Sequence, residues 1–175
     1  ADIVLPRIHS DSLQGDRAIA DIMKSLGVTT EFLNGELRLT RGPHVHSITW
    51  DFTHCPDLAQ TVAVVCAAKG IGGSFTGLES LRIKETDRID ALQKELRKIG
   101  ADLIETSNSS WQLVPSTTLP GTAAFRTYED HRMAMAFAPL ATRMNIGIED
   151  PGVVKKSYPT FWEDVRSFGF KTSER

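Results

Sequence analysis

The sequence predicts an α/β fold that is built from a repeated unit, and three observations lead to this expectation. Segments with apolar residues at helical spacing alternate with strand-like segments, and the connections between them are short. Two further helical segments are apolar on nearly all sides, which is typical of helices buried in the middle of a domain. The chain also resembles itself at a spacing of roughly 70 residues, so the same order of elements recurs along it.

The first kind of segment is an amphipathic helix, and the sequence predicts three of them. They cover residues 16–26, 86–99 and 161–168, and each has apolar side chains on one face. A glycine follows each helix, as is common where a helix ends in a left-handed residue. Hairpins of alternating apolar and polar residues follow the first two helices, at residues 30–40 and 101–114.

The second kind of segment is a helix of small apolar residues, predicted at residues 57–69 and 131–143. Pro139 should kink or shorten the second of these helices. Each helix leads through a strand-like stretch into a lysine, which is Lys84 in one unit and Lys156 in the next. The repeated unit therefore consists of a buried helix, a strand, a lysine loop, an amphipathic helix and a hairpin.

Residues 1–175 are expected to form a single domain with three such units. These run approximately over residues 1–50, 51–118 and 119–175. The first lacks a buried helix at its start, and the third lacks a hairpin at its end. We therefore expect the chain to be part of a longer protein.

Composition excludes several classes of protein. The 175 residues include 20 Lys and Arg against 22 Asp and Glu, and this net charge of −2 argues against general nucleic-acid binding. No apolar run approaches the ~20 residues needed to span a bilayer, and residues 1–17 lack a signal-peptide pattern, so no membrane partner is expected. Cys55 and Cys66 are too few for a disulfide scaffold and are expected to be reduced thiols in a cytosolic protein.

Several motifs make the chain resemble a known enzyme family. The second lysine loop reads SLRIKETDRI (residues 80–89), the second buried helix starts with YEDHRMAM (residues 128–135), and the third loop reads VKKSYPTF (residues 154–161). Together with Pro56-Asp57 and with SLQGD at residues 12–16, these motifs closely resemble the C-terminal half of the 5-enolpyruvylshikimate-3-phosphate (EPSP) synthase family.

The resemblance implies a two-domain enzyme in which each domain has three βαβαββ units, with buried central helices and mixed sheets outside. It implies transfer of the enolpyruvyl group of phosphoenolpyruvate to the 5-hydroxyl of shikimate 3-phosphate, with release of phosphate, in the cytoplasmic synthesis of aromatic amino acids. Neither a metal nor an organic cofactor is required, and the family is the target of glyphosate. This chain would form one wall of the active-site cleft. The N-terminal domain of the same protein, its expected partner, would form the other wall, so the isolated chain is expected to be inactive.

The same resemblance implies roles for individual residues. Asp57 is expected to take the proton from the shikimate hydroxyl, and Glu85 is the candidate to donate or relay a proton to the methylene carbon of phosphoenolpyruvate. Which residue protonates that carbon stays open. Asp57, Ser80 and Lys84 are expected to bind shikimate 3-phosphate, with Lys84 close to the reacting hydroxyl. Ser80 stands where the family often has asparagine, and its hydroxyl lacks the reach of an amide.

Three cations match the family's ligands for phosphoenolpyruvate, namely Arg88, Arg132 and Lys156. All three are predicted close to helix starts, where the helix dipole disfavours positive charge, so convergence on a bound anion explains them. His131 adjoins Arg132 in the matched motif and is expected to line the cleft.

Each of these assignments has a simpler structural alternative. Asp57 could cap the helix that follows Pro56, and the charged KETDR run could be the solvated first turn of a helix. His44 and His46 form a pair that could bind a metal, but two ligands without a third usually have no such role. Two other functions also stay open. One is a UDP-N-acetylglucosamine enolpyruvyl transferase, a related class that typically lacks KETDR, and the other is a non-catalytic repeat domain that binds a partner chain.

Overall fold

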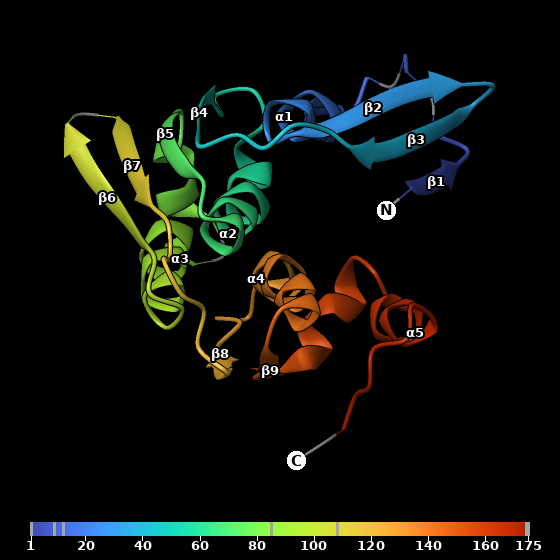
Figure 1. The fold of residues 1–175 in the computed structure, drawn as a ribbon. Coiled ribbons are helices and arrows are strands. Elements are labelled where there is room, and N and C mark those ends of the chain that lie inside the picture. Colours follow the sequence, from blue (N-terminus) through green and yellow to red (C-terminus); the bar gives the residue numbers. More distant parts are fainter. Residues whose placement is uncertain (1, 9, 12, 85, 108, 174–175) are drawn as a thin grey trace.

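The structure is a computed structural model that describes residues 2–8, 10–11, 13–84, 86–107 and 109–173. Its helices and strands alternate along the chain (Figure 1), which confirms the predicted α/β class. The strands are β1 (Asp2–Pro6), β2 (Val28–Leu33), β3 (Glu36–Arg41), β4 (Ser47–Asp51), β5 (Gly72–Thr76), β6 (Asp102–Ser107), β7 (Ser110–Val114), β8 (Thr122–Phe125) and β9 (Asn145–Ile148). The helices are α1 (Ile19–Ser25), α2 (Ala59–Lys69), α3 (Arg88–Arg97), α4 (His131–Phe137) and α5 (Phe161–Ser167). Short 3₁₀ helices are η1 (Gly15–Ala18), η2 (Pro56–Leu58), η3 (Glu79–Ile83), η4 (Ala138–Thr142) and η5 (Pro151–Lys156).

The middle of the chain contains all six elements of a βαβαββ unit, in the order β4, α2, β5, α3, β6 and β7. Its four strands form one sheet in the order β4-β5-β7-β6, in which β4 and β5 are parallel and β7 is antiparallel to both of its neighbours. The turn after β5 requires a glycine. Gly77 has a φ of +73°, and a Cβ at this position would collide with the backbone nitrogen of Thr53. This turn directs the chain into the loop that carries Lys84.

The two other sheets reproduce parts of this arrangement. The antiparallel sheet β1-β3-β2 has the strand order of β5-β7-β6, and the parallel pair β8-β9 matches β4-β5. The sequence patterns did not reveal β4 and β8, the strands that precede the two buried helices. These strands have only five and four residues, so their alternation of apolar and polar residues is too short to stand out.

The predicted central helices are present and buried. Most side chains of α2 are buried, including Val62, Cys66 and Ala67, each of which is 0% exposed. Helix α4 packs directly against α2 (Figure 1). It gives way to η4 at Ala138, just before Pro139, so the expected shortening of this helix is confirmed.

The three amphipathic helices are also present. In α3 the apolar face is fully buried at Ile89, Leu92 and Leu96, as the spacing of these residues predicted. Helix α5 differs, because none of its residues is buried and Phe168, at its C-terminal end, is 79% exposed. The expected apolar stripe is therefore largely uncovered in the described part of the chain, and α5 is held instead by contacts such as the hydrogen bond from the Trp162 indole to the Pro151 carbonyl.

The remaining features of the chain concern its thiols, histidine pair and helix lengths. Both cysteines are buried free thiols, and burial raises the pKa of Cys66 to about 12. The rings of His44 and His46 pack against each other at 4.8 Å, and the described residues contain no group of three side chains suited to holding a metal ion. No helix in the described ranges combines the length and the apolar character that crossing a membrane requires.

Candidate active site

Asp57 lies at the start of the buried helix α2, in the short turn η2 that Pro56 begins. Its carboxylate is directed at positively charged side chains. Oδ1 accepts a hydrogen bond of 2.8 Å from Arg88, and Oδ2 accepts one of 2.9 Å from Arg132. Lys84 Nζ lies 3.7 Å from Oδ1. In the described structure, η2 and α2 begin without a side-chain cap, so Asp57 acts here as a partner for cations.

Arg88 is the first residue of α3, and its side chain is only 2% exposed. A buried guanidinium is costly unless several acceptors surround it. Besides Asp57, these acceptors include Asp130, whose Oδ2 lies 2.7 Å from Arg88 Nε. Asp87 caps the helix by accepting the backbone N–H of Asp90 at 3.0 Å. The start of α3 is therefore stabilised by carboxylates, which offset the unfavourable position of the arginine.

Asp130 connects the cluster, although the sequence reasoning did not select it. Its side chain is completely buried and caps α4 by accepting the backbone N–H of Arg132 at 2.9 Å. It also accepts hydrogen bonds from Arg88 and, at 3.4 Å, from the amide of Gln60 in α2. The one signal in the sequence is an aspartate directly before a predicted helix, which indicates a cap and nothing about Arg88 or Gln60.

The remaining predicted cations differ in how firmly they are held. Arg132 is 25% exposed, and its guanidinium group donates hydrogen bonds to the carboxylate and to the carbonyl oxygen of Asp57. Lys156 ends η5 and donates a hydrogen bond of 3.3 Å to the carbonyl oxygen of Glu129, the residue before Asp130. The structure thus brings Asp57, Lys84, Arg88 and Arg132 into one cluster, with Lys156 attached through the neighbouring backbone.

His131 lies between these groups, and its side chain is 14% exposed. Burial lowers the pKa of His131, and the positive charges of Arg132, Lys156 and Arg88 lower it further, while Asp130 acts in the opposite direction. Its Nδ1 is buried and has no hydrogen-bond partner among the described residues. The imidazole is therefore held in its neutral form.

One predicted residue in the described structure, Ser80, does not join the cluster. Ser80 is exposed in η3, and the described structure contains no hydrogen bond between its hydroxyl and the cluster. Glu85 lies outside the described residues.

Comparison with known proteins decides the family. The family model for EPSP synthase (3-phosphoshikimate 1-carboxyvinyltransferase) matches residues 1–165. This chain belongs to the EPSP synthase family. The 3-phosphoshikimate 1-carboxyvinyltransferase of Bacteroides fragilis (strain ATCC 25285) is 47% identical over 176 residues, which cover 97% of this chain and 42% of the relative. The enzyme of the same name from Sulfurovum sp. (strain NBC37-1) is 36% identical over 162 residues, which cover 91% of this chain and 37% of the relative.

Solved structures agree on the fold of this EPSP synthase family chain. An EPSP synthase from Acinetobacter baumannii superimposes with a TM-score of 0.75 at 21% identity, covering 95% of this chain and 41% of that one. The chain therefore spans about two fifths of the length of the relatives that it matches. Both of these relatives are named for 3-phosphoshikimate, and neither is named for a UDP-sugar.

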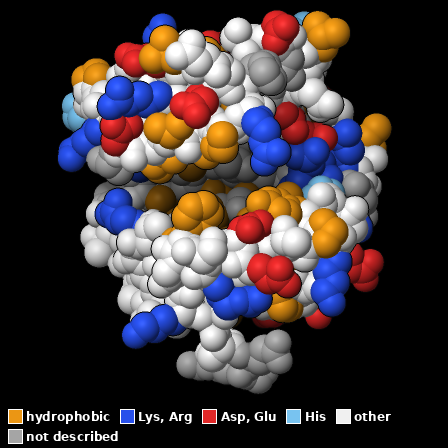
Figure 2. Space-filling model, turned by 90° about the vertical axis from the view of Figure 1, so that its right-hand side faces the viewer, with side chains coloured by type: hydrophobic (Ala, Val, Ile, Leu, Met, Phe, Trp, Pro, Cys, Tyr) orange, Lys and Arg blue, Asp and Glu red, His pale blue; other side chains and the backbone are white. Residues whose placement is uncertain are grey.

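A cavity of about 300 Å³ adjoins the cluster of this EPSP synthase family domain, and several of its lining residues were not predicted. Figure 2 shows a hollow across the face that β2, β3 and α5 border, with Lys and Arg side chains gathered at one end. The cavity is lined by Gln14, Gly15, Asp16, His54, Cys55, Pro56, Asp57 and Arg132. The first repeat thus contributes its loop to the site, although this loop lacks the lysine that marks the other two.

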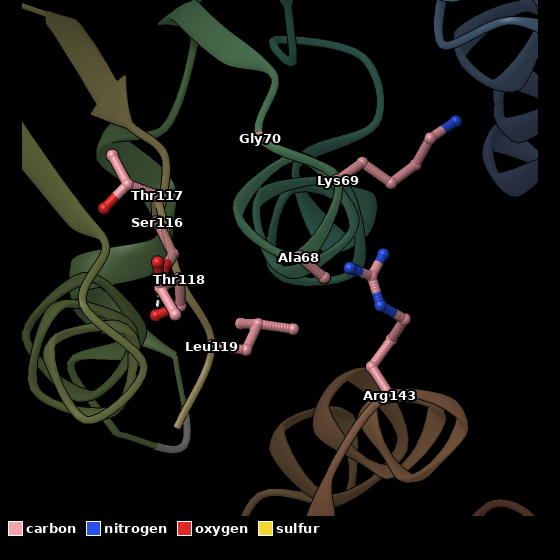
Figure 3. Close-up of a pocket in the computed structure, with 8 residues that line it drawn as sticks. All are labelled: Ala68, Lys69, Gly70, Ser116, Thr117, Thr118, Leu119 and Arg143. Atoms are coloured by element: carbon pink, nitrogen blue, oxygen red, sulfur yellow. Dashed lines mark hydrogen bonds between the residues drawn. The ribbon is translucent and has the colours of Figure 1, made fainter. Parts of the chain in front are cut away.

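A second cavity, of about 410 Å³, lies at the opposite end of α2 (Figure 3). It is lined by Ala68, Lys69, Gly70, Ser116, Thr117, Thr118, Leu119 and Arg143. None of the predicted site residues lines this cavity. The larger of these two cavities is therefore not the one beside the predicted site residues.

Proposed function

We propose that this chain forms one wall of the active site of an EPSP synthase, as the C-terminal domain of a longer cytoplasmic enzyme. The reaction transfers the enolpyruvyl group of phosphoenolpyruvate to the 5-hydroxyl of shikimate 3-phosphate and releases phosphate. The single observation that carries this proposal is the carboxylate of Asp57 held between the guanidinium groups of Arg88 and Arg132, at 2.8 and 2.9 Å.

The chemistry explains why a carboxylate and several cations belong together. The 5-hydroxyl loses a proton as its oxygen bonds to C2 of phosphoenolpyruvate, and C3 gains a proton. The adduct then expels phosphate from C2 and loses a proton from C3, which restores the double bond. A base must accept the hydroxyl proton, an acid must supply the proton to C3, and cations must balance two phosphates and a carboxylate.

In this proposal Asp57 is the base, and Arg88, Arg132 and Lys156 bind phosphoenolpyruvate. In the structure without ligands, the guanidinium groups of both arginines bind Asp57. An arriving anion competes for the same N–H groups, so binding of phosphoenolpyruvate weakens the hold on the carboxylate. Binding of one substrate therefore releases the carboxylate that acts on the other.

Lys84, Ser80 and Glu85 complete the proposed set. Lys84 lies 3.7 Å from Asp57 Oδ1 and is 36% exposed, so its ammonium is available to shikimate 3-phosphate beside the reacting hydroxyl. Ser80 precedes it in the same loop and is proposed as a weaker ligand of the same substrate. Glu85, next to Lys84 in sequence, is proposed to donate or relay a proton to C3. His131 is proposed to line the cleft as a neutral side chain.

The test is Asp57→Asn in the full-length enzyme that carries these residues. Loss of the base should lower kcat by roughly 10²- to 10⁴-fold, which a coupled phosphate-release assay measures. Asp102→Asn is the matched control, because Asp102 is a partly exposed carboxylate on β6 that pairs with Arg97. If the folded Asp57→Asn enzyme transfers enolpyruvyl groups at the wild-type rate, the proposal is wrong.

A second test addresses the need for two walls. The 175-residue chain alone should show no turnover, because the groups that stabilise the transition state are shared with the proposed N-terminal domain. Addition of this chain to both substrates should release no phosphate above background, while the full-length enzyme under the same conditions should. Steady turnover by the chain alone contradicts the two-wall arrangement.

A further inference from the structure

Glu95 is a fully buried carboxylate in α3, two helical turns after Arg88. In the described part of the chain, its hydrogen bonds and ion pair involve none of the residues assigned to the site. Instead, its Oε1 accepts a hydrogen bond of 2.8 Å from the Tyr128 hydroxyl, and its Oε2 accepts one of 3.0 Å from the backbone N–H of Arg126. Lys98 Nζ lies 2.7 Å from Oε2. A carboxylate so deeply buried needs such partners, and two of them come from one short segment.

That segment joins β8 to α4 and has an unusual backbone. Tyr128 and Glu129 are consecutive non-glycine residues with φ of +53° and +58°. The left-handed region is unfavourable for both, because the Cβ of an L-residue crowds the backbone there. Two such residues in succession persist only where the surrounding structure determines their conformation. Glu95 supplies this constraint from one side, and the hydrogen bond of 2.9 Å from the Asp130 N–H to the Thr127 carbonyl supplies it from within the turn.

The left-handed turn positions much of the cation cluster. Asp130 follows it directly and binds Arg88 and the backbone of Arg132. The carbonyl oxygen of Glu129, within the turn, accepts the hydrogen bond from Lys156. All three proposed ligands of phosphoenolpyruvate therefore depend on how this turn is held.

Helix α3 is thus attached to the segment at two points. Arg88 binds Asp130 at the start of the helix, and Glu95 binds Arg126 and Tyr128 two turns later. The first attachment changes when an anion binds to Arg88. The residues of the second attachment neither line the cavity nor serve as proposed ligands, so this attachment keeps its geometry while the first is rearranged.

We propose that Glu95 is a positioning residue for the anion site, which fixes the left-handed turn at Tyr128 and Glu129 so that Arg88, Arg132 and Lys156 converge. This inference rests on the proposed function, because phosphoenolpyruvate is the anion concerned. Burial and the hydrogen bond to Glu95 raise the pKa of Tyr128 to about 12, so its hydroxyl remains a donor at every physiological pH.

The experiment compares three variants of the full-length enzyme. Glu95→Ala removes both hydrogen bonds to the turn, and Tyr128→Phe removes one of them without removing the ring. Lys98→Gln is the control, because it removes the ion pair with Glu95 and the hydrogen bond of 2.9 Å to the Ala124 carbonyl in β8, but keeps both hydrogen bonds from Glu95 to the segment of the turn. Glu95→Ala should raise KM for phosphoenolpyruvate roughly tenfold or more, since small displacements of positioned groups are costly, while KM for shikimate 3-phosphate changes less than twofold.

Tyr128→Phe should raise the same KM by a smaller factor, and Lys98→Gln should leave both constants at the wild-type values. Glu95→Gln, which keeps one acceptor oxygen, should recover part of the loss. If Glu95→Ala and Tyr128→Phe lower the melting temperature but keep the wild-type KM for phosphoenolpyruvate, Glu95 is merely structural and the proposal is overturned. Tyr128→Phe decides the matter alone if Glu95→Ala does not fold.

A readout without turnover separates this inference from the proposed function. The NMR resonances of the His131 imidazole, one residue after Asp130, should shift in Glu95→Ala and stay in place in Lys98→Gln. If the two variants show this pattern but the wild-type enzyme does not transfer enolpyruvyl groups, the proposed function is contradicted and the positioning role is still supported. An active wild type with unchanged resonances and KM in both turn variants contradicts the positioning role alone.

Discussion

Positive side chains lie at the N-terminal ends of α3 and α4 and also at or beyond the C-terminal ends of α2 and α4, yet the surroundings of these side chains differ. At the N-terminal ends, Arg88 and Arg132 bind the carboxylate of Asp57, and Arg88 is 2% exposed. At the C-terminal ends, Lys69 donates a hydrogen bond of 2.8 Å to the carbonyl of Leu26, and Arg143 is exposed (Figure 3). The cavity between Lys69 and Arg143 is the larger of the two, but it contains no carboxylate.

The helix dipole explains the difference. Cations at a helix C-terminus face the partial negative charge of free carbonyl groups and are stabilised without further partners. Cations at an N-terminus face partial positive charge, and burial removes the water that screens it. Arg88 is therefore stabilised by surrounding carboxylates, which include Asp57 and Asp130. Positive charge that is buried against the dipole, and held by carboxylates from other elements, is a better indication of an anion site than the number of cations or the size of a cavity.

The largest effect expected from this comparison is on stability, in Asp130→Asn. The asparagine keeps the cap on α4 but leaves Arg88 buried with one carboxylate fewer. Breaking a buried ion pair costs about 3–5 kcal/mol, so the free energy of unfolding should fall by this amount in urea denaturation. Asp130→Ala should cost about 1 kcal/mol more, because the cap is lost as well. A loss below about 1 kcal/mol in Asp130→Asn means that Arg88 does not depend on this partner.

The sequence predicted the fold better than it predicted these partners. Apolar side chains on nearly all sides of residues 57–69 indicate burial, and the structure confirms α2 as a central helix. The contacts of Asp130 with Gln60 and Arg88 join positions 70 and 42 residues apart. Local patterns carry no information about such pairs, so the sequence alone predicts only a helix cap at Asp130. The motif resemblance selected Asp57 and the cations around it, but it omitted Asp130, which also holds Arg88.

The next effect concerns binding and tests Arg132, the more exposed of the two arginines that bind Asp57. Because it is 25% exposed, Arg132→Lys should change the free energy of unfolding by less than about 1 kcal/mol. KM for phosphoenolpyruvate should rise roughly tenfold or more, since lysine cannot form two parallel hydrogen bonds to an anion. Steady-state kinetics of the full-length enzyme measure both constants. Arg97→Lys, at an exposed position in α3, is the control and should leave KM unchanged. Equal effects in the two variants contradict the special position of Arg132.

A smaller effect is expected in the pH dependence of stability, through His131. Its pKa in the folded chain is lowered from 6.5, mainly by burial and by the cations around it. The unfolded chain therefore binds the proton more readily, and protonation favours unfolding. The contribution of His131 to stability is complete above pH 6.5 and is lost as the pH falls from 6.5 to the lower pKa of the folded chain. Urea denaturation from pH 5 to pH 8 should show this slope in the wild type and a reduced slope in His131→Asn. An unchanged slope means that the cations do not act on His131.

The smallest effects are expected at the opposite end of α2, and they decide whether the comparison holds. Arg143→Gln removes an exposed cation near helix carbonyl groups, which should cost at most about 0.5 kcal/mol. Arg143→Glu places a negative charge near the same carbonyl groups and should cost about 0.3–1 kcal/mol. A larger loss of stability in Arg143→Glu than in Arg143→Gln would show that the helix dipole favours positive charge at this position. Lys69→Met loses the hydrogen bond to Leu26 and should cost about 1 kcal/mol. None of the three should change kcat or either KM in the full-length enzyme. If Arg143→Gln raises KM for phosphoenolpyruvate as Arg132→Lys does, the two ends are functionally alike. The position of a cation relative to the helix dipole then does not distinguish an anion-binding residue from an ordinary surface residue.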